Sequence, residues 1–416
     1  MAGVSTPATS GSRPDGERRL NVVVGVTGGI AAYKAVGVIR AFVLAGHDVH
    51  VVATDAALRF VGKPTLEAIS RNPVHTDLYE AVAEVRHVAI GQAADLIVVA
   101  PATANTLARI TAGLAEDLLG NTILASTAPL VVAPAMHTEM WNNPATVANM
   151  ERLRERGVVV VGPGSGRLTG SDSGLGRMSE PEEIVAIALG AVGPRDLDGK
   201  RILITAGGTR EPLDPVRFLG NRSSGKQGVA FASAAARRGA EVTLIAAHLE
   251  VAAPYGVTVV EVGSALELAE ATSSAAARAD VVIMAAAVAD YRPTAIAEGK
   301  IRKEVHGDRL SLELVRNPDI LAGLAAAREG DPARSGQVII GFGAETEPDT
   351  ARLLELGRQK IARKGSDFLV LNRVGWSEGF GTDGNSIIVI NGAGDIVIEA
   401  SGSKTAIADR ILDLLS

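Results

Sequence analysis

The chain has 416 residues, of which 47% are hydrophobic and 21% are charged, so it is long enough for at least two globular domains. Its formal net charge of −6 argues against nucleic acid as the main partner. No apolar run reaches the ~18 residues that a membrane span needs. The absence of cysteine excludes disulfides, thiolate metal sites and cysteine nucleophiles. Residues 1–18 lack the apolar core of a signal peptide, so we expect a disordered tail on a cytoplasmic protein.

In the first half of the chain, short apolar runs alternate with helical patterns. Strands are predicted at 21–26, 50–54, 95–100, 130–133 and 158–161. Helices are predicted at 30–44, 64–70, 103–112, 117–126, 144–156 and 181–189. This alternation predicts a doubly wound, Rossmann-like parallel sheet, in which ligands bind beyond the carboxyl ends of the strands.

Small and polar residues follow three of these predicted strands. They are Gly28 and Gly29, then Thr54, then Pro101, Thr103 and Asn105. The first turn lacks the GxGxxG pattern and no acidic residue ends the second strand, which disfavours NAD. Hydroxyl and amide groups at several strand ends instead suit a phosphate together with a polar ring edge, as in flavin mononucleotide (FMN).

Two motifs, PATANT at 101–106 and PAMHTEMW at 134–141, resemble the PASANT and PxMNxxMW signatures of the flavin-dependent cysteine decarboxylases. The sequence GGIAAYK at 28–34 resembles the opening loop of that family. The resemblance implies a flavodoxin-like, FMN-dependent phosphopantothenoylcysteine decarboxylase domain over 19–190. It implies that the strand-end residues above contact FMN and that three further residues lie on the substrate side of the flavin, namely Met136, Met140 and Trp141.

The resemblance also implies a reaction and two catalytic histidines. In that family FMN oxidises the cysteinyl thiol to a thioaldehyde, carbon dioxide leaves, and the reduced flavin returns the hydride to give 4′-phosphopantetheine. His75 matches the family's active-site histidine, and imidazole exchanges protons near neutral pH. His137 stands where the family motif has asparagine, and it can still donate a hydrogen bond to the substrate carboxylate.

The glycine-rich stretch at 162–178 matches the flap of that family, and its composition suits a mobile lid over the flavin. The family's flap carries a cysteine that is thought to reprotonate the product, and this position aligns near Gly170. Because the chain has no cysteine, another acid must serve. Water, Ser171 and Asp172 remain open as candidates.

A polar stretch with glycine and proline at 191–199 is the predicted linker to a second domain at 200–416. That domain opens with a strand at 202–205 and a Gly-Gly turn. About fifteen irregular residues then precede an alanine-rich helix at 228–238, and a loop of that length inside a domain is usually functional. Its glycine, serine and basic residues before a helix suit anion binding, although an ordinary surface loop is the alternative.

The rest of the second half again alternates. Strands are predicted at 241–246, 257–262, 281–287, 310–314, 338–342 and 368–371, with a terminal hairpin at 387–390 and 396–399. Helices are predicted at 265–277, 350–363 and 404–415. The chain is therefore predicted to hold two doubly wound α/β domains. Four lysines with one carboxylate, Asp290, suit a nucleoside triphosphate, because the lysines can meet the phosphates and the carboxylate can bind the base, the ribose or a magnesium ion. The lysines are Lys300, Lys303, Lys360 and Lys364, and no P-loop motif is present.

Six motifs in order resemble the phosphopantothenate–cysteine ligase family. They are ITAGGTREPLDPVRFLGNRSSGKQG from 204, MAAAVADYRP from 284, KIRK from 300, NPDIL from 317, GFGAET from 341 and RQKIARK from 358. The resemblance implies that the carboxylate of 4′-phosphopantothenate attacks the α-phosphate of CTP to give an acyl-cytidylate. The amine of cysteine then forms the amide and releases CMP, with Mg²⁺ and lysines stabilising the phosphate charge.

The same resemblance assigns residues to this reaction. It places Asn221 at the acyl-cytidylate, in a site completed across a dimer and therefore open to use in a neighbouring subunit. It implies contacts with CTP for Met284, Ala285, Ala286, Asp290, Lys300, Asn317, Pro318, Asp319, Ile320, Phe342, Lys360 and Lys364. No metal ligands are assigned.

Together the two halves resemble the bifunctional enzymes of coenzyme A biosynthesis. The resemblance implies 4′-phosphopantothenate, cysteine and CTP as substrates, and a dodecamer built from flavin-domain trimers and ligase-domain dimers. One alternative is a flavin-dependent prenyl transferase or redox enzyme that shares the first fold. Another is a ligase with a flavin-binding regulatory half, which the missing cysteine favours and which His75 opposes.

Overall fold

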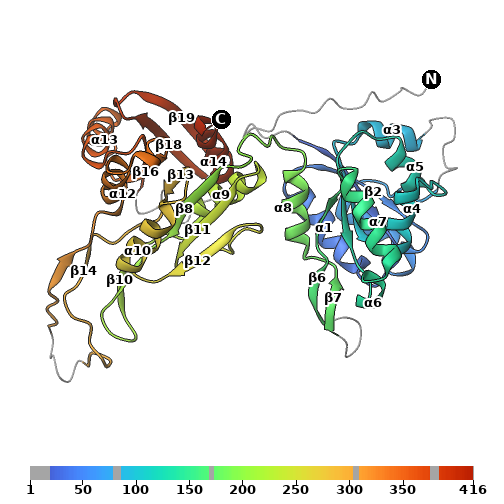
Figure 1. The fold of residues 1–416 in the computed structure, drawn as a ribbon, viewed down its shortest axis with the longest axis horizontal. Coiled ribbons are helices and arrows are strands. Elements are labelled where there is room, and N and C mark those ends of the chain that lie inside the picture. Colours follow the sequence, from blue (N-terminus) through green and yellow to red (C-terminus); the bar gives the residue numbers. More distant parts are fainter. Residues whose placement is uncertain (1–18, 78–85, 168–172, 303–308, 375–383, 416) are drawn as a thin grey trace. The chain divides into compact units, whose positions relative to one another are not determined.

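The structure is a computed structural model that describes residues 19–77, 86–167, 173–302, 309–374 and 384–415. The chain divides into two compact units, Met1–Pro194 and Arg195–Ser416 (Figure 1). The division falls inside the stretch 191–199, and the expected tail at 1–18 lies outside the described residues. Within the described part of the chain, no helix is both long and apolar enough to cross a membrane.

The first unit is built on a five-stranded parallel sheet in the order β2-β1-β3-β4-β5. This order is that of flavodoxin-like folds, whose switch point lies between the first and third strands. Its strands are β1 (Asn21–Val26), β2 (Asp48–Ala53), β3 (Leu96–Ala102), β4 (Leu130–Pro134) and β5 (Val159–Val160). The predicted flavodoxin-like fold is confirmed.

Helices cover both faces of this sheet because the strand residues are apolar on both sides. Val22 and Val24 of β1 pack with α1 and α8, whereas Val23 packs with α4, α5 and α7. The helices are α1 (Ala32–Leu44), α2 (Lys63–Ser70), α3 (Arg86–Ala93), α4 (Ala104–Ala112), α5 (Leu118–Leu124), α6 (Thr138–Trp141), α7 (Pro144–Glu155) and α8 (Pro181–Gly190). An antiparallel pair, β6 (Gly164–Arg167) and β7 (Ser173–Arg177), lies within the predicted flap.

The second unit holds an eight-stranded sheet in the order β12-β11-β8-β13-β16-β17-β18-β19. The first six strands are parallel in the Rossmann order, with β8 and β13 flanking the switch point. They are β8 (Arg201–Gly207), β11 (Glu241–Ala247), β12 (Thr258–Val262), β13 (Val281–Met284), β16 (Val338–Glu345) and β17 (Phe368–Arg373). The sheet is not parallel throughout, because β18 (Gly384–Asn391) and β19 (Ile396–Ser403) form an antiparallel hairpin on β17.

Two sets of helices sandwich this sheet. Phe231 of α9 (Lys226–Arg237) and Ile407 of α14 (Lys404–Leu412) belong to the core on one face. On the other face lie Leu268 of α10 (Ala265–Ala276) and Leu324 of α12 (Ile320–Glu329). A smaller cluster around Leu353 seats α13 (Thr350–Lys364) on β17.

Three predictions of local structure in this unit need correction. The expected strand at 310–314 is wrong, because residues 309–313 form no helix or strand. The strand β15 (Leu314–Arg316) begins only at the end of that stretch and pairs with β14 (Tyr291–Pro293). The alternating leucines there stay exposed instead of facing a core. The loop that was expected to be irregular contains the hairpin of β9 (Arg210–Pro212) and β10 (Phe218–Gly220). The strand expected at 281–287 is shorter than predicted, because β13 ends at Met284. The helix α12 was not predicted.

Figure 1 shows β10 and β14 projecting beyond the main sheet of the unit.

Candidate functional sites

In the first unit, the loops that follow β1 and β3 are joined at the switch point. Oγ1 of Thr27, which is buried, donates a hydrogen bond to the carbonyl of Pro101 at 2.6 Å. A Cβ atom on Gly29 would lie 3.5 Å from Cγ2 of Thr103, an ordinary contact, so the glycine turn and the PATANT motif are neighbours. The N–H of Thr54 donates to the carbonyl of Val26 at 3.0 Å, which brings the end of β2 to the same edge.

Two helices begin at this edge and make it suited to an anion. Thr103 caps α4 by accepting from the N–H of Thr106, and α1 begins directly after the glycine turn without a side-chain cap. Helix N-termini offer free N–H groups and a positive partial charge to phosphates. A Cβ on Gly28 would lie 2.4 Å from that of Ala56, so this turn requires glycine. With the exposed amide of Asn105, the donor set fits FMN.

His75 lies beside the end of β2. Its backbone extends the sheet, because its N–H donates to the carbonyl of Val51 at 3.0 Å and its carbonyl accepts from the N–H of Ala53 at 3.0 Å. Its side chain is half-buried. The structure therefore brings His75 to the sheet edge that also carries Thr54, although 20 residues of sequence and α2 intervene.

The flap hairpin packs on the PAMHTEMW motif. The N–H of Met136 donates to the carbonyl of Gly176 at 3.0 Å, and a Cβ on Gly176 would lie only 2.2 Å from the carbonyl oxygen of Met136. The buried Oγ1 of Thr138 faces Gly174 and has no hydrogen-bond partner among the described residues. In the same segment, His137 and Met140 are exposed and Trp141 is half-buried, while Gly170, Ser171 and Asp172 lie outside the described residues.

A lysine that the sequence analysis did not single out anchors the base of the flap. Lys34 of α1 is 7% exposed, and its Nζ donates to the carbonyl of Met178 at 3.0 Å and to Oε1 of Glu180 at 2.9 Å. The hydrogen bond from Lys34 holds the pKa of Glu180 below its usual value, against a smaller opposing effect of burial. A lysine on the otherwise apolar face of α1 was the available sequence signal.

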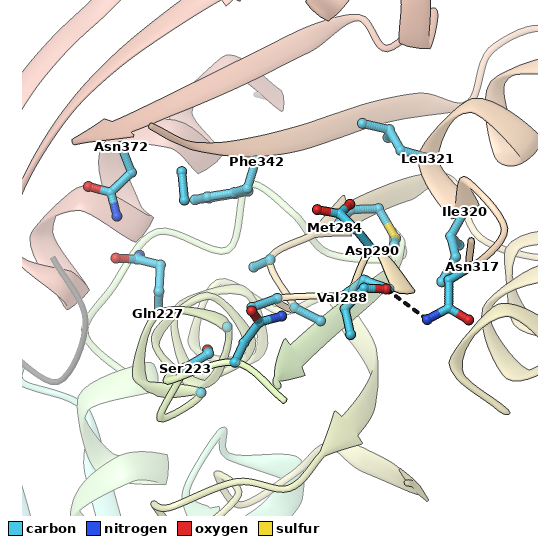
Figure 2. A pocket seen from close by; sticks show the side chains of 18 of the residues that line it. Ser223, Gln227, Met284, Val288, Asp290, Asn317, Ile320, Leu321, Phe342 and Asn372 are labelled. Carbon is cyan, nitrogen blue, oxygen red and sulfur yellow. Dashed lines mark hydrogen bonds between the residues drawn. The ribbon is translucent and has the colours of Figure 1, made fainter. Parts of the chain in front are cut away.

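In the second unit, a pocket of about 400 Å³ opens beyond the carboxyl ends of β8 and β13 (Figure 2). Its wall contains nearly all of the residues predicted for the ligase reaction: Asn221, Met284, Ala285, Ala286, Asp290, Asn317, Pro318, Asp319, Ile320, Phe342, Lys360 and Lys364. Lys300 is the exception, because it is exposed and does not line this pocket. Lys303 lies outside the described residues.

The pocket floor depends on a close approach of two loops. Gly207 has a φ of +89°, and a Cβ there would lie 1.8 Å from the carbonyl oxygen of Ala247, so no other residue fits. The N–H of Ala287 donates to the carbonyl of Gly207 at 2.8 Å, and that of Ala289 donates to Oγ1 of Thr209 at 2.9 Å. The AGGT turn thus supports the MAAAVAD segment, whose residues from Met284 to Asp290 form the pocket floor.

Asn317 connects this floor to α12. Its Nδ2 donates to the carbonyl of Ala289 at 2.8 Å, the bond drawn dashed in Figure 2, and its N–H donates to the carbonyl of Asp290 at 2.8 Å. Its Oδ1 accepts from Arg292 at 3.0 Å. Asn317 is 6% exposed, and its amide is used in hydrogen bonds that hold the pocket wall together. Asp290, in contrast, is exposed and its carboxylate lies at the rim of the pocket.

Both lysines of α13 that line the pocket are paired with acids. Nζ of Lys360 lies 2.7 Å from Oε1 of Glu345, and Lys364 forms an ion pair with Asp319. Burial raises the pKa of Asp319, but the hydrogen bonds from Lys364 and from the N–H of Ala322 outweigh it, and the net pKa is below its usual value. An anionic ligand therefore meets lysines that are already held in place.

Three amide side chains line the pocket with buried polar atoms that have no partner among the described residues. They are Oε1 of Gln227, Oδ1 of Asn372 and Nδ2 of Asn385. Figure 2 shows Gln227 and Asn372 at the end of the pocket near Phe342. A buried polar atom without a hydrogen bond is costly, so this end fits a polar ligand such as a nucleotide. None of the three was predicted, because their convergence from α9, β17 and β18 depends on the fold.

The described residues contain no group of three or more histidine, aspartate or glutamate side chains placed to hold a metal ion. The pocket offers lysines, amides and a helix N-terminus, a donor set that suits phosphates.

The fold and the sites define a two-domain α/β protein with a flavodoxin-like unit and a polar, lysine-lined pocket in a Rossmann-ordered unit. The sequence profile described as "DNA/pantothenate metabolism flavoprotein C-terminal domain" matches residues 197–416, and the profile "Flavoprotein" matches residues 10–193. The chain belongs to the family of bifunctional coenzyme A biosynthesis proteins, on the strength of the following relatives.

A "Coenzyme A biosynthesis bifunctional protein CoaBC" of Mycobacterium tuberculosis is 52% identical over 400 residues, which cover 95% of this chain and 96% of the relative. The protein of that name from Escherichia coli K12 is 42% identical over 397 residues, covering 94% and 95%. A solved structure of the C-terminal domain of a CoaBC protein shares 37% identity, covers 53% of this chain and 95% of that chain, and has a TM-score of 0.43. The predicted bifunctional flavoprotein is confirmed, and the prenyl transferase or redox interpretation is wrong.

Proposed function

We propose that the second unit ligates 4′-phosphopantothenate to cysteine with CTP, through an acyl-cytidylate, and that the first unit decarboxylates the 4′-phosphopantothenoylcysteine so formed. The observation that supports the ligase most directly is the convergence of five separate motifs on the wall of one pocket. Its volume of about 400 Å³ lies within the range of small-molecule sites.

Within this pocket, the triphosphate would lie between the N-terminus of α9 and the lysines of α13. Lys360 and Lys364 would exchange their carboxylate partners in part for phosphate oxygens. The two lysines, together with bound Mg²⁺, would stabilise the negative charge that builds during attack at the α-phosphate. Phe342 is held edge-to-face on Phe231 with ring centroids 5.6 Å apart, and it offers a flat apolar surface to the cytosine. Asn221 at the pocket wall would bind the acyl-cytidylate.

Lys300 supports a ligase dimer. It is exposed, it belongs to the segment that follows β14, and it is absent from the pocket wall of its own chain. In this proposal Lys300 meets the triphosphate in the pocket of a partner subunit, whereas Asn221 serves its own pocket. Dimeric ligase units combined with trimeric flavin units would give a dodecamer. The molar mass measured by light scattering tests this assembly.

The first unit would hold FMN across the β1–β3 edge, with phosphate at the helix N-termini and the ring near Thr54, Thr103 and Asn105. Bound FMN supplies the two-electron oxidation of the cysteinyl thiol that allows carbon dioxide to leave. His75 would hold or move the proton at that thiol, and His137 would donate a hydrogen bond to the departing carboxylate. The hairpin packed on Met136 would exclude water from the substrate side.

The experiment supplies the purified protein with 4′-phosphopantothenate, cysteine, CTP and Mg²⁺ and follows pyrophosphate and carbon dioxide separately. The release of both products is expected, and the purified protein should be yellow because it holds FMN. His75→Asn should abolish carbon dioxide release alone, and Lys300→Ala should reduce pyrophosphate release while decarboxylation of supplied intermediate continues. Pyrophosphate without carbon dioxide from the wild type would contradict the decarboxylase and favour a flavin-binding regulatory half.

A further inference from the structure

The buried carboxylate of Asp214 joins two segments of the second unit that lie far apart in sequence. Its Oδ1 accepts from the N–H groups of Val216 at 2.7 Å and Arg217 at 2.8 Å, which closes the turn between β9 and β10. Its Oδ2 accepts from the N–H of Ile301 at 3.0 Å, across 87 residues of sequence. The Asp214 side chain is 0% exposed, so all three bonds are shielded from water.

Further hydrogen bonds surround this connection. The N–H of Ala297 donates to the carbonyl of Leu213 at 3.0 Å, and Nη2 of Arg217 donates to the carbonyl of Ile301 at 2.5 Å. The segment 297–301 is therefore fixed to the turn at both ends, although it contains no helix or strand of its own. The residue next to Ile301 is the exposed Lys300.

The bond to Ile301 lowers the pKa of Asp214 most, against the effect of burial, and the bonds from the turn lower it further. The carboxylate is therefore ionised near neutral pH and accepts all three N–H groups at once. A neutral amide at this position has one acceptor oxygen, so it cannot serve both the turn and the Ile301 segment in the same way.

We propose that Asp214 is a positioning residue for ligation, which fixes the segment bearing Lys300 so that this ammonium meets the nucleotide phosphates in a defined place. The inference rests on the proposed CTP-dependent function. Its physical basis is pre-organisation, because a lysine on a free loop must first be ordered when the phosphates bind. Asp214 touches no substrate in this role and acts through Lys300 alone.

Two variants remove the same bond from opposite sides. Asp214→Asn removes one acceptor, and Ile301→Pro removes the N–H donor while leaving the turn bonds of Asp214 intact. Gly299→Ala is the control, since a Cβ there would meet no heavy atom within 4 Å. Each variant, with Lys300→Ala, is made in the full-length FMN-loaded protein and checked by thermal unfolding.

Hydrogen exchange of peptides that cover 297–301 reports the anchor, and initial rates of pyrophosphate release at varied CTP report its function. Asp214→Asn and Ile301→Pro should exchange faster there and lower kcat/KM for CTP by about tenfold, while Gly299→Ala changes neither. Because Asp214 acts through Lys300, the Asp214→Asn/Lys300→Ala double variant should be no slower than Lys300→Ala. Carbon dioxide release from supplied intermediate should stay at the wild-type rate.

Faster exchange with unchanged kcat/KM for CTP would overturn the positioning role, as would losses from Asp214→Asn and Lys300→Ala that multiply. If Asp214→Asn does not fold, Ile301→Pro decides by the same two measurements. If the wild type itself releases no pyrophosphate, the proposed function fails and the positioning role with it, whereas failure of the positioning role alone leaves wild-type pyrophosphate release intact.

Discussion

Nζ of Lys360 lies 2.7 Å from Oε1 of Glu345, so a pocket lysine is held by a carboxylate of its own chain. Glu345→Gln should lower the Kd for CTP by about threefold, because phosphate no longer competes with a partly exposed ion pair. Calorimetric titration measures this. Glu355→Gln is the control, since it removes the same charge from α13 outside the pocket wall. Weaker CTP binding by Glu345→Gln would mean that the carboxylate orients Lys360 instead of competing for it.

The ion pair between Asp319 and Lys364 gives a pH-dependent prediction. The pKa of Asp319 is lowered in the folded protein, so the stability it contributes is present above the unfolded pKa of about 4 and is lost as pH falls through the lower folded value. Asp319→Asn should therefore lower the free energy of unfolding at pH 7, and the difference from wild type should shrink on acidification. Urea titrations across pH measure it.

The control for that prediction is Asp349→Asn. Both aspartates cap a helix, accepting from the N–H of Ala322 and Arg352 respectively, but Asp349 has no lysine partner among the described residues. Asparagine is as good a helix cap as aspartate, so the control should show little change. An equal, pH-independent loss in both variants would contradict the role of the ion pair.

The unpartnered Oδ1 of Asn372 predicts opposite effects on stability and binding. Asn372→Leu should leave the free energy of unfolding unchanged or raise it by about 1 kcal/mol, because it removes a buried acceptor that lacks a hydrogen bond. It should weaken CTP binding by about tenfold or more, since the nucleotide loses that acceptor. Thermal unfolding and calorimetric titration test the two halves. Unchanged CTP affinity would place the nucleotide away from this end of the pocket.

Lys34→Met should affect the first unit alone. It leaves the carbonyl of Met178 without its donor at the base of the flap, at a cost of about 1–3 kcal/mol in the free energy of unfolding. Carbon dioxide release should slow and pyrophosphate release should not. Lys63→Met is the matched control, because Lys63 is 40% exposed and lies 4.0 Å from Glu67. A ligation rate that falls in parallel would contradict a local effect.

Gly176→Ala tests the seating of the flap on the PAMHTEMW motif. The added Cβ would lie 2.2 Å from the carbonyl oxygen of Met136, so the hairpin must shift and carbon dioxide release should fall by about tenfold or more. Gly164→Ala in the same hairpin makes only an ordinary contact at 3.7 Å and should retain the wild-type rate. Equal rates in the two variants would show that the flap position does not matter for decarboxylation.

Most of the strands and helices were predictable because their signals are local. Apolar runs rich in β-branched residues define β1, β3, β8 and β13, and glycine turns mark where the loops after β1 and β8 begin. Loop conformation was less predictable. The alternation at 310–314 indicated a strand, yet Leu310 and Leu312 stay exposed, because alternation becomes a strand only beside a pairing partner.

The sequence by itself determined the two α/β units, because periodicity and turn residues act over short distances, and the resemblance of its motifs to a known family indicated most of the pocket wall. Only the tertiary structure decided the antiparallel pairing of the predicted terminal hairpin with β17, the absence of Lys300 from its own pocket and the bond from Asp214 to Ile301. Each of these depends on residues far apart in the chain, and such pairings are set by packing and burial in the folded protein rather than by any local pattern.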